Sequence, residues 1–172
     1  MPARLAILGA APYAARGFVF NKPSDIFSIL GGEMFWNRHK KLGVAVTCAD
    51  WRLHQRRVDL NTRLARQLRV GGVDVTAVPG PDGLLRPERA GEWQAVRDWA
   101  KLLVTAHHAE ALAVVAHQKC AGHPVSDTEH DHDVVEVAKA LKAAIGFGGP
   151  TQALVAIFHN DAKWGLKLVA RV

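Results

Sequence analysis

Short apolar runs alternate with segments whose apolar residues recur every three or four positions, and this alternation constrains the fold more than any other feature. The strand-like runs lie at residues 44–48, 73–78, 111–116 and 153–158. The helical segments lie at residues 58–70, 88–107 and 131–145. A short, continuous apolar run favours a strand that is buried on both faces, as in a parallel sheet. The alternation therefore predicts an α/β fold.

Within this fold class we expect a mainly parallel four-stranded sheet in the order 2-1-3-4, flanked by helices. Residues 166–169 are a candidate for a short antiparallel fifth strand. We expect a single domain over residues 1–172, with an N-terminal arm or helix region at 1–41 and an α/β core at 42–172. Ser24 is the expected cap of a helix that ends near His39.

Charge and hydropathy exclude several classes of protein. No apolar run reaches the roughly 18 residues that a membrane span requires, and the N-terminus lacks the long apolar core of a secretion signal. We therefore expect a cytoplasmic protein without a membrane partner. The net charge of +6 would suit nucleic acid. The arginines between 52 and 69 are instead spaced as on a solvated helix, without a nucleic-acid motif, so a nucleic-acid-binding domain ranks last.

Both cysteines of the chain lie just after strand-like runs. The first run ends in Cys48-Ala49-Asp50-Trp51-Arg52, and the third ends in His117-Gln118-Lys119-Cys120. In open α/β sheets, ligands bind beyond the carboxyl ends of strands, where the strand order reverses. If strands 1 and 3 are neighbours, Cys48 faces His117 and Cys120. Two thiolates and one imidazole suit zinc, and three protein ligands leave a fourth position for water.

Each of these residues also has an ordinary structural explanation. A cysteine on a strand is usually a small buried apolar group, and an Asp-x-Arg pair is usually a surface ion pair. His117 alone would be read as a hydrogen-bonded core histidine. A disulfide between Cys48 and Cys120 is a further alternative. The metal hypothesis is favoured because both cysteines occupy the predicted strand ends together.

Cys-x-Asp-x-Arg followed by His-x-x-Cys, each after a buried strand, resembles the zinc signature of β-class carbonic anhydrases. The chain resembles a small, divergent member of that family from about residue 44 to the C-terminus. Residues 153–158 resemble its last central strand, and residues 160–166 resemble the hairpin that follows. The resemblance implies Zn2+ as the cofactor, with Cys48, His117 and Cys120 as its ligands.

The same resemblance implies an enzyme, a lyase that reversibly hydrates carbon dioxide to bicarbonate by zinc-bound hydroxide. Asp50 and Arg52 are the implied catalytic residues: Asp50 accepts a hydrogen bond from the hydroxide, and Arg52 keeps Asp50 ionised. The implied partners are a small-molecule substrate and a second copy of the chain, in a homodimer or a larger homo-oligomer. Two alternatives stay open: a zinc hydrolase acting on carbonyl sulfide or carbon disulfide, and a non-catalytic zinc protein whose pocket Trp51 blocks.

The pocket motifs depart from the family pattern. After the second strand the family usually has Asn-Ala-Gly, whereas this chain has Val78-Pro79-Gly80-Pro81. The family usually has glycine directly after the second cysteine, whereas this chain has Ala121 and only then Gly122. We therefore expect an intact metal site in a remodelled substrate pocket.

Three histidines follow the second metal motif and could relay protons: His123, His130 and His132. The acidic residues around them are also typical of the solvated first turn of a helix, which the helix dipole stabilises. We favour the solvated interpretation for the helix start at residues 129–133, which contains His130 and His132.

Overall fold

A computed structural model describes residues 41–55, 59–160 and 163–172 of the chain. The predicted N-terminal arm and its helix capped by Ser24 lie outside these residues. The extent of the domain over residues 1–172 therefore stays a prediction. No helix in the described part of the chain is both long and apolar enough to cross a membrane.

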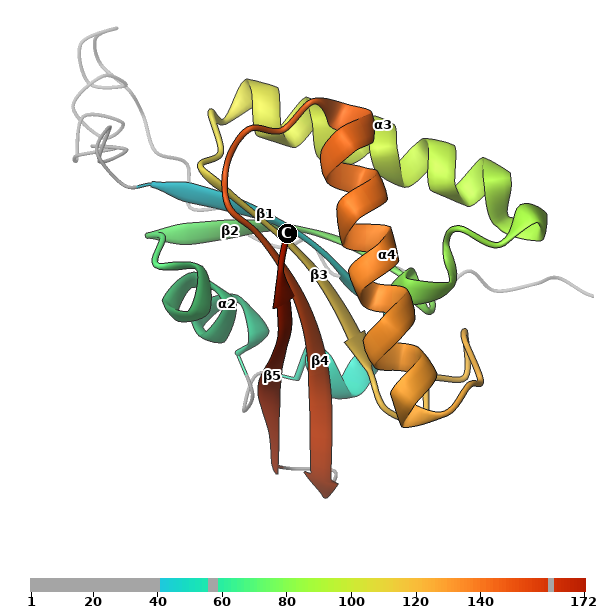
Figure 1. Ribbon diagram of the computed structural model, residues 1–172. Coiled ribbons are helices and arrows are strands. Elements are labelled where there is room, and N and C mark those ends of the chain that lie inside the picture. The colour runs from blue at the N-terminus through green and yellow to red at the C-terminus, as the bar shows by residue number, and fades with distance from the viewer. Residues whose placement is uncertain (1–40, 56–58, 161–162) are drawn as a thin grey trace, which may run out of the picture. The chain divides into compact units, whose positions relative to one another are not determined.

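One mixed sheet organises the described chain (Figure 1). Its strands are β1 (Leu42–Cys48), β2 (Gly72–Val78), β3 (Ala111–His117), β4 (Thr151–Asn160) and β5 (Lys163–Arg171). The strand order is β2-β1-β3-β4-β5, with the first four strands parallel and β5 antiparallel to β4. The predicted order is confirmed. The fifth strand is a full member of the sheet and longer than the predicted 166–169.

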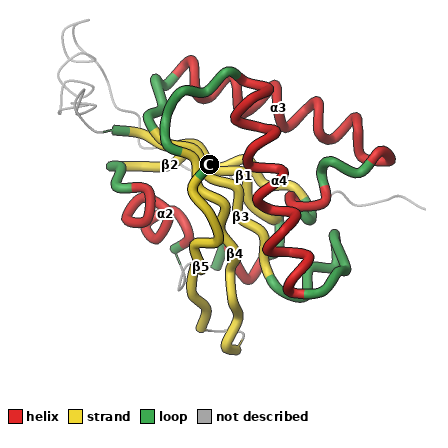
Figure 2. Tube along the Cα trace, in the orientation of Figure 1, coloured by secondary structure: helices red, strands yellow, loops and turns green. Residues whose placement is uncertain are grey.

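Helices cover both faces of the sheet, as Figure 2 shows by colour. The helices are α2 (Leu60–Leu68), α3 (Ala90–Ala106) and α4 (Asp127–Ile145). α3 and α4 contribute to the apolar core that contains Val44 and Val46, whereas α2 contributes to the core that contains Ala45. Successive strand side chains point to opposite faces, so the continuous apolar runs supply both cores at once.

The helix α2 follows directly from its sequence pattern. Leu60, Leu64 and Leu68 recur at steps of four and are all buried on one side of the helix. The Asp59 carboxylate accepts a hydrogen bond from the Thr62 backbone N–H and caps the first turn. The predicted helix over 58–70 is therefore correct in type, and the helix ends at Leu68, two residues before the predicted end.

The helix α4 begins at Asp127, four residues before the predicted start. Ser126 and Glu129 form a capping box: the Ser126 hydroxyl accepts from the Glu129 N–H, and the Glu129 carboxylate accepts from the Ser126 N–H. This signal stands in the sequence as Ser-x-x-Glu. The earlier start places His130 one turn before Val134, on the buried face of the helix.

Candidate metal centre

The ends of β1 and β3 bring three metal-ligating side chains together. The two strands are parallel neighbours, and Cys48 and His117 are their last residues, so both lie at the same edge of the sheet. The Sγ atoms of Cys48 and Cys120 lie 3.6 Å apart, and both cysteines are free thiols. The ligand atoms of Cys48, His117 and Cys120, here called the thiolate cluster, all lie within 4.8 Å of one another and could hold a metal ion.

The imidazole of His117 is oriented by the chain itself. Its Nδ1 donates a hydrogen bond to the Gln118 carbonyl at 2.8 Å, which leaves the lone pair on Nε2. Nε2 is buried and makes no hydrogen bond of ordinary geometry. A buried nitrogen acceptor without a partner costs free energy, and a metal ion would satisfy it. The donor set of two sulfurs and one imidazole nitrogen therefore fits zinc.

The two thiols share one proton between them. Cys48 is stabilised as a thiolate by a hydrogen bond from Cys120, which outweighs burial and lowers its pKa from 9.0 to about 6. The Gly80 N–H also donates to Cys48 Sγ, at 3.4 Å. The same contact with Cys48, together with burial, raises the pKa of Cys120 to about 12. One thiolate is thus present at neutral pH, which is the form that binds metal.

The pKa of His117 is raised, although burial acts to lower it. Burial by itself would lower the pKa of this imidazole, but its interaction with Cys120, the Gln118 carbonyl and the negative charge of Asp50 together raise it. The cluster therefore favours positive charge at its centre.

Asp50 and Arg52 lie beside the cluster as a two-point ion pair. Arg52 Nε donates to Asp50 Oδ1 at 2.9 Å, and Nη2 donates to Oδ2 at 2.6 Å. The Arg52 backbone N–H donates to Oδ1 as well, which caps the short 3-10 helix η1 (Trp51–Leu53). These hydrogen bonds hold the pKa of Asp50 below its ordinary value of 3.8. Asp50 Oδ2 lies 3.6 Å from His117 Nε2, so the carboxylate borders the cluster.

The cluster opens into a small pocket of about 200 Å3. The pocket is lined by Cys48, Ala49, Asp50, Pro79, His117, Cys120, Ala121 and Gly122. Trp51 does not line the pocket and is 65% exposed. The expectation that Trp51 could block the pocket therefore has no support in this structure.

Two glycines that the sequence analysis recorded only as departures from the family pattern hold the pocket loops together. Gly80 has a φ of +50°, and a Cβ there would lie 2.6 Å from the Gly122 backbone. A Cβ on Gly122 would in turn meet the Gly80 nitrogen at 2.8 Å. Arg89, which the sequence analysis missed, donates to the Gly80 carbonyl at 2.5 Å and to the Pro79 carbonyl at 2.6 Å. Only the packed loops show why these residue types are needed.

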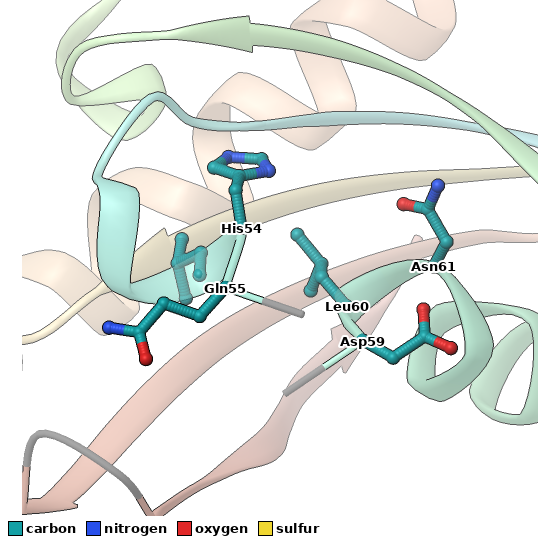
Figure 3. Close-up of a pocket in the computed structure, with 6 residues that line it drawn as sticks. His54, Gln55, Asp59, Leu60 and Asn61 are labelled. Carbon is teal, nitrogen blue, oxygen red and sulfur yellow. The ribbon is translucent and has the colours of Figure 1, made fainter. Parts of the chain in front are cut away.

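A second cavity, of about 320 Å3, lies beside the first turn of α2 (Figure 3). It is lined by Leu53, His54, Gln55, Asp59, Leu60 and Asn61. His54 Nε2 donates to the Cys48 carbonyl at 2.8 Å and so supports the end of β1. None of the lining residues belongs to a metal-ligating group found among the described residues. This cavity is a neighbour of the candidate centre rather than part of it.

The interpretation of residues 129–133 as a solvated helix start is wrong for His130, and His123 is buried as well. His123 and His130 are 1% and 0% exposed, whereas the side chain of His132 is 73% exposed. His130 is buried because the helix begins earlier than predicted, and His123 because its ring packs against Gly83. The sequence signal that was available is the spacing of His130, Val134, Val137 and Leu141 along one face.

Comparison with known protein families supports the family resemblance found in the sequence. A family model described as putative carbonic anhydrase matches residues 38–170, which is more than half of the chain. The chain therefore belongs to this family, and the resemblance to carbonic anhydrases is confirmed. A search of curated proteins found no match.

Proposed function

We propose that this member of the carbonic anhydrase family is a zinc enzyme that reversibly hydrates carbon dioxide to bicarbonate. Cys48, His117 and Cys120 are the proposed zinc ligands. Asp50 and Arg52 are the proposed residues that orient the reacting water. The observation that carries the proposal is the thiolate cluster itself, which lies in a small pocket beside a carboxylate held 3.6 Å from His117 Nε2.

In the proposed reaction, zinc would activate the water, and residues of the chain would orient it. Cys48, His117 and Cys120 would hold the zinc ion, which would supply the Lewis acidity that lowers the pKa of water to about 7. The overall reaction consumes one water and one carbon dioxide and gives bicarbonate and one proton.

Asp50 orients the reacting water through a hydrogen bond. An ionised carboxylate can only accept, so Oδ2 takes the O–H of the water and turns its lone pair towards the substrate. Arg52 makes this orientation reliable, because its two donated hydrogen bonds fix the carboxylate plane and keep Asp50 ionised. Arg52 is itself held over the ring of Phe158, 4.4 Å from its centroid.

The walls of the pocket suit a small, apolar substrate. Ala49, Pro79 and Ala121 present carbon atoms close to the ligating sulfurs. A pocket of about 200 Å3 has room for a triatomic molecule and its product, and is smaller than the roughly 300–1,000 Å3 typical of sites for drug-sized ligands. Carbon dioxide has no net dipole and gains from leaving water for such a surface.

A second candidate function is hydrolysis of carbonyl sulfide or carbon disulfide at the same centre. The observation that favours it is Pro79, which lines the pocket where the family usually has Asn-Ala-Gly. Without the amide of that asparagine, the wall is better suited to a sulfur-containing analogue.

The assembly and location of the protein form part of the same proposal. The family resemblance supports a homodimer or a larger homo-oligomer, and the proposed location is the cytoplasm. Light scattering of the full chain at several concentrations tests the first, and a concentration-independent monomer would contradict it. Fractionation of expressing cells tests the second, and recovery outside the cytoplasmic fraction would contradict it.

The test joins metal analysis to stopped-flow kinetics on reduced, full-length protein. We expect cobalt-substituted protein to show a thiolate-to-metal absorption band, and Cys48→Ser to lose it. Asp50→Ala should keep the band and lose carbon dioxide hydration, whereas Asp98→Ala, an exposed aspartate beside Arg97, should lose neither. Faster turnover of carbonyl sulfide than of carbon dioxide would favour the second candidate. Wild-type protein without thiolate-bound metal would overturn the proposal.

A further inference from the structure

A second group of ligating side chains lies on the other side of the packed pocket loops. Asp82 comes from the 3-10 helix η2 (Pro81–Gly83), His123 from the segment after β3, and His130 and Asp133 from α4. These four residues are here called the carboxylate–imidazole cluster. None of them belongs to the thiolate cluster, and the proposed reaction uses none of them.

The side chains of this cluster are brought together from distant parts of the sequence. Asp82 Oδ2 lies 2.5 Å from His130 Nδ1 and 4.0 Å from His123 Nε2. Asp133 Oδ2 lies 2.9 Å from the same nitrogen of His123. The ligand atoms of Asp82, His123 and His130 all lie within 4.8 Å of one another. Neighbouring ligand atoms on a tetrahedral ion, bound at roughly 2.0–2.1 Å, lie about 3.3 Å apart. The observed separations bracket this value.

Burial of these polar groups without a cation costs folding free energy. Asp82 is 2% exposed, and His123 and His130 are 1% or less. The second oxygen of Asp82, Oδ1, is buried without a hydrogen-bond partner, and so is His130 Nε2. Hydrogen bonds between the imidazoles and the carboxylates therefore satisfy only part of the group. An incompletely paired buried carboxylate destabilises the fold, and a bound cation relieves that cost.

The backbone around the cluster packs closely against the His123 ring. A Cβ on Gly83 would lie 2.6 Å from His123 Nδ1, so this imidazole packs directly against the η2 backbone. The Gly80–Gly122 contact fixes the two segments that carry Asp82 and His123. The ligands are thus positioned by rigid packing rather than by surface side chains.

We propose that Asp82, His123 and His130, with Asp133 as the fourth ligand, form a second metal site that binds a divalent transition ion. Two imidazoles and two carboxylates suit Zn2+, Mn2+, Fe2+ or Co2+. Because all ligands are from the protein and three are buried, the site is structural rather than catalytic. The ion joins α4 to η2 and to the segment that follows Cys120. It thereby braces the loops whose Gly80 N–H donates to Cys48 Sγ.

Metal titration of the reduced apoprotein tests this directly. We expect wild-type protein to bind two Zn2+ per chain with retained secondary structure. A Cys48→Ser/Cys120→Ser variant should bind one, and cobalt in it should lack the thiolate band. Asp82→Asn should also bind one Zn2+, and its cobalt-substituted form should keep the thiolate band. One ion per wild-type chain and none in the double cysteine variant would overturn the second site and leave the proposed function standing.

A milder variant covers the case in which Asp82→Asn fails to fold. Asp133 is 32% exposed, so Asp133→Asn should fold and weaken binding at the second site by at least about tenfold, since even outer partners of a metal cost 10–100-fold. Asp98→Asn, the same substitution at an exposed aspartate on α3, should leave both affinities unchanged. Unchanged affinity in Asp133→Asn together with two ions in Asp82→Asn would place the second ion elsewhere and reject the site. A wild-type chain that binds metal only here would instead reject the proposed function.

Discussion

The thiolate cluster and the carboxylate–imidazole cluster lie on two sides of the same pair of loops, yet they differ in donor chemistry and in access. The first has two sulfurs and one nitrogen, faces a pocket of about 200 Å3 and borders the ionised Asp50. The second has nitrogens and oxygens, and three of its residues are at most 2% exposed. An open coordination position is what separates a reactive metal site from a structural one. This difference is the reason for proposing a reactive metal site at the first cluster and a structural one at the second.

The largest expected effect on activity comes from removing one proposed ligand of the thiolate cluster alone. His117→Ala should reduce carbon dioxide hydration to the uncatalysed background, because the Nε2 ligand is lost. Metal at the carboxylate–imidazole cluster should be retained. Stopped-flow assay and metal titration measure the two effects. His107→Ala, at a partly exposed histidine that pairs with Asp74 and contributes to neither cluster, is the control. Loss of both metals from His117→Ala would break the division between the clusters.

A smaller effect is expected when the carboxylate beside the thiolate cluster loses its partner. Arg52→Gln removes the two side-chain hydrogen bonds that hold Asp50. We expect activity to fall by about 10–100-fold with both metals retained, as is typical of residues that orient metal-site groups. The pKa of Asp50 should return towards its ordinary value, which stopped-flow assays over pH would detect. Arg97→Gln, at another arginine paired with an aspartate, should be close to wild type. Full activity in Arg52→Gln would remove Asp50 orientation from the mechanism.

The shared loops offer a variant that should affect both clusters together. Gly80→Ala places a Cβ 2.6 Å from the Gly122 backbone at a φ of +50°. Strain and overpacking should destabilise the fold by about 2 kcal/mol and weaken binding at both sites. Gly146→Ala, at a φ of +67° with open space around its Cβ, should cost stability by strain alone and leave both affinities unchanged. Chemical denaturation and metal titration measure the two effects. Weakening at only one site would show that the loops do not couple the clusters.

The smallest effect is expected at the start of α4, which carries only the second cluster. Ser126→Ala removes the helix cap and should cost about 1 kcal/mol at neutral pH. The Ser126 hydroxyl holds the pKa of Glu129 below its ordinary 4.5. A lowered carboxyl pKa contributes stability above the unfolded pKa and loses it as pH falls through the folded value. The difference in free energy of unfolding between wild type and variant, measured by denaturation, should therefore become smaller below about pH 4.5. A gap that widens in acid would contradict this account.

The two clusters also differ in how far sequence reasoning could reach them. Cys48 and His117 stand directly after apolar runs, and parallel strands end at the same edge of a sheet, so their proximity was predictable. Asp82, His123 and His130 follow no such rule. Their meeting depends on where α4 begins and on the contact between Gly80 and Gly122. The capping box at Ser126 was the one local signal that could have corrected the helix start.

The amino-acid sequence by itself determined the α/β class, the strand order and the three residues of the thiolate cluster. It could do so because burial on both faces leaves a continuous apolar signature, and because short motifs at strand ends carry their own geometry. Only the tertiary structure decided that Trp51 does not line the pocket, that His123 and His130 are buried, and that two glycines join the loops. These outcomes depend on contacts between segments far apart in the chain, whose free energies no local pattern contains.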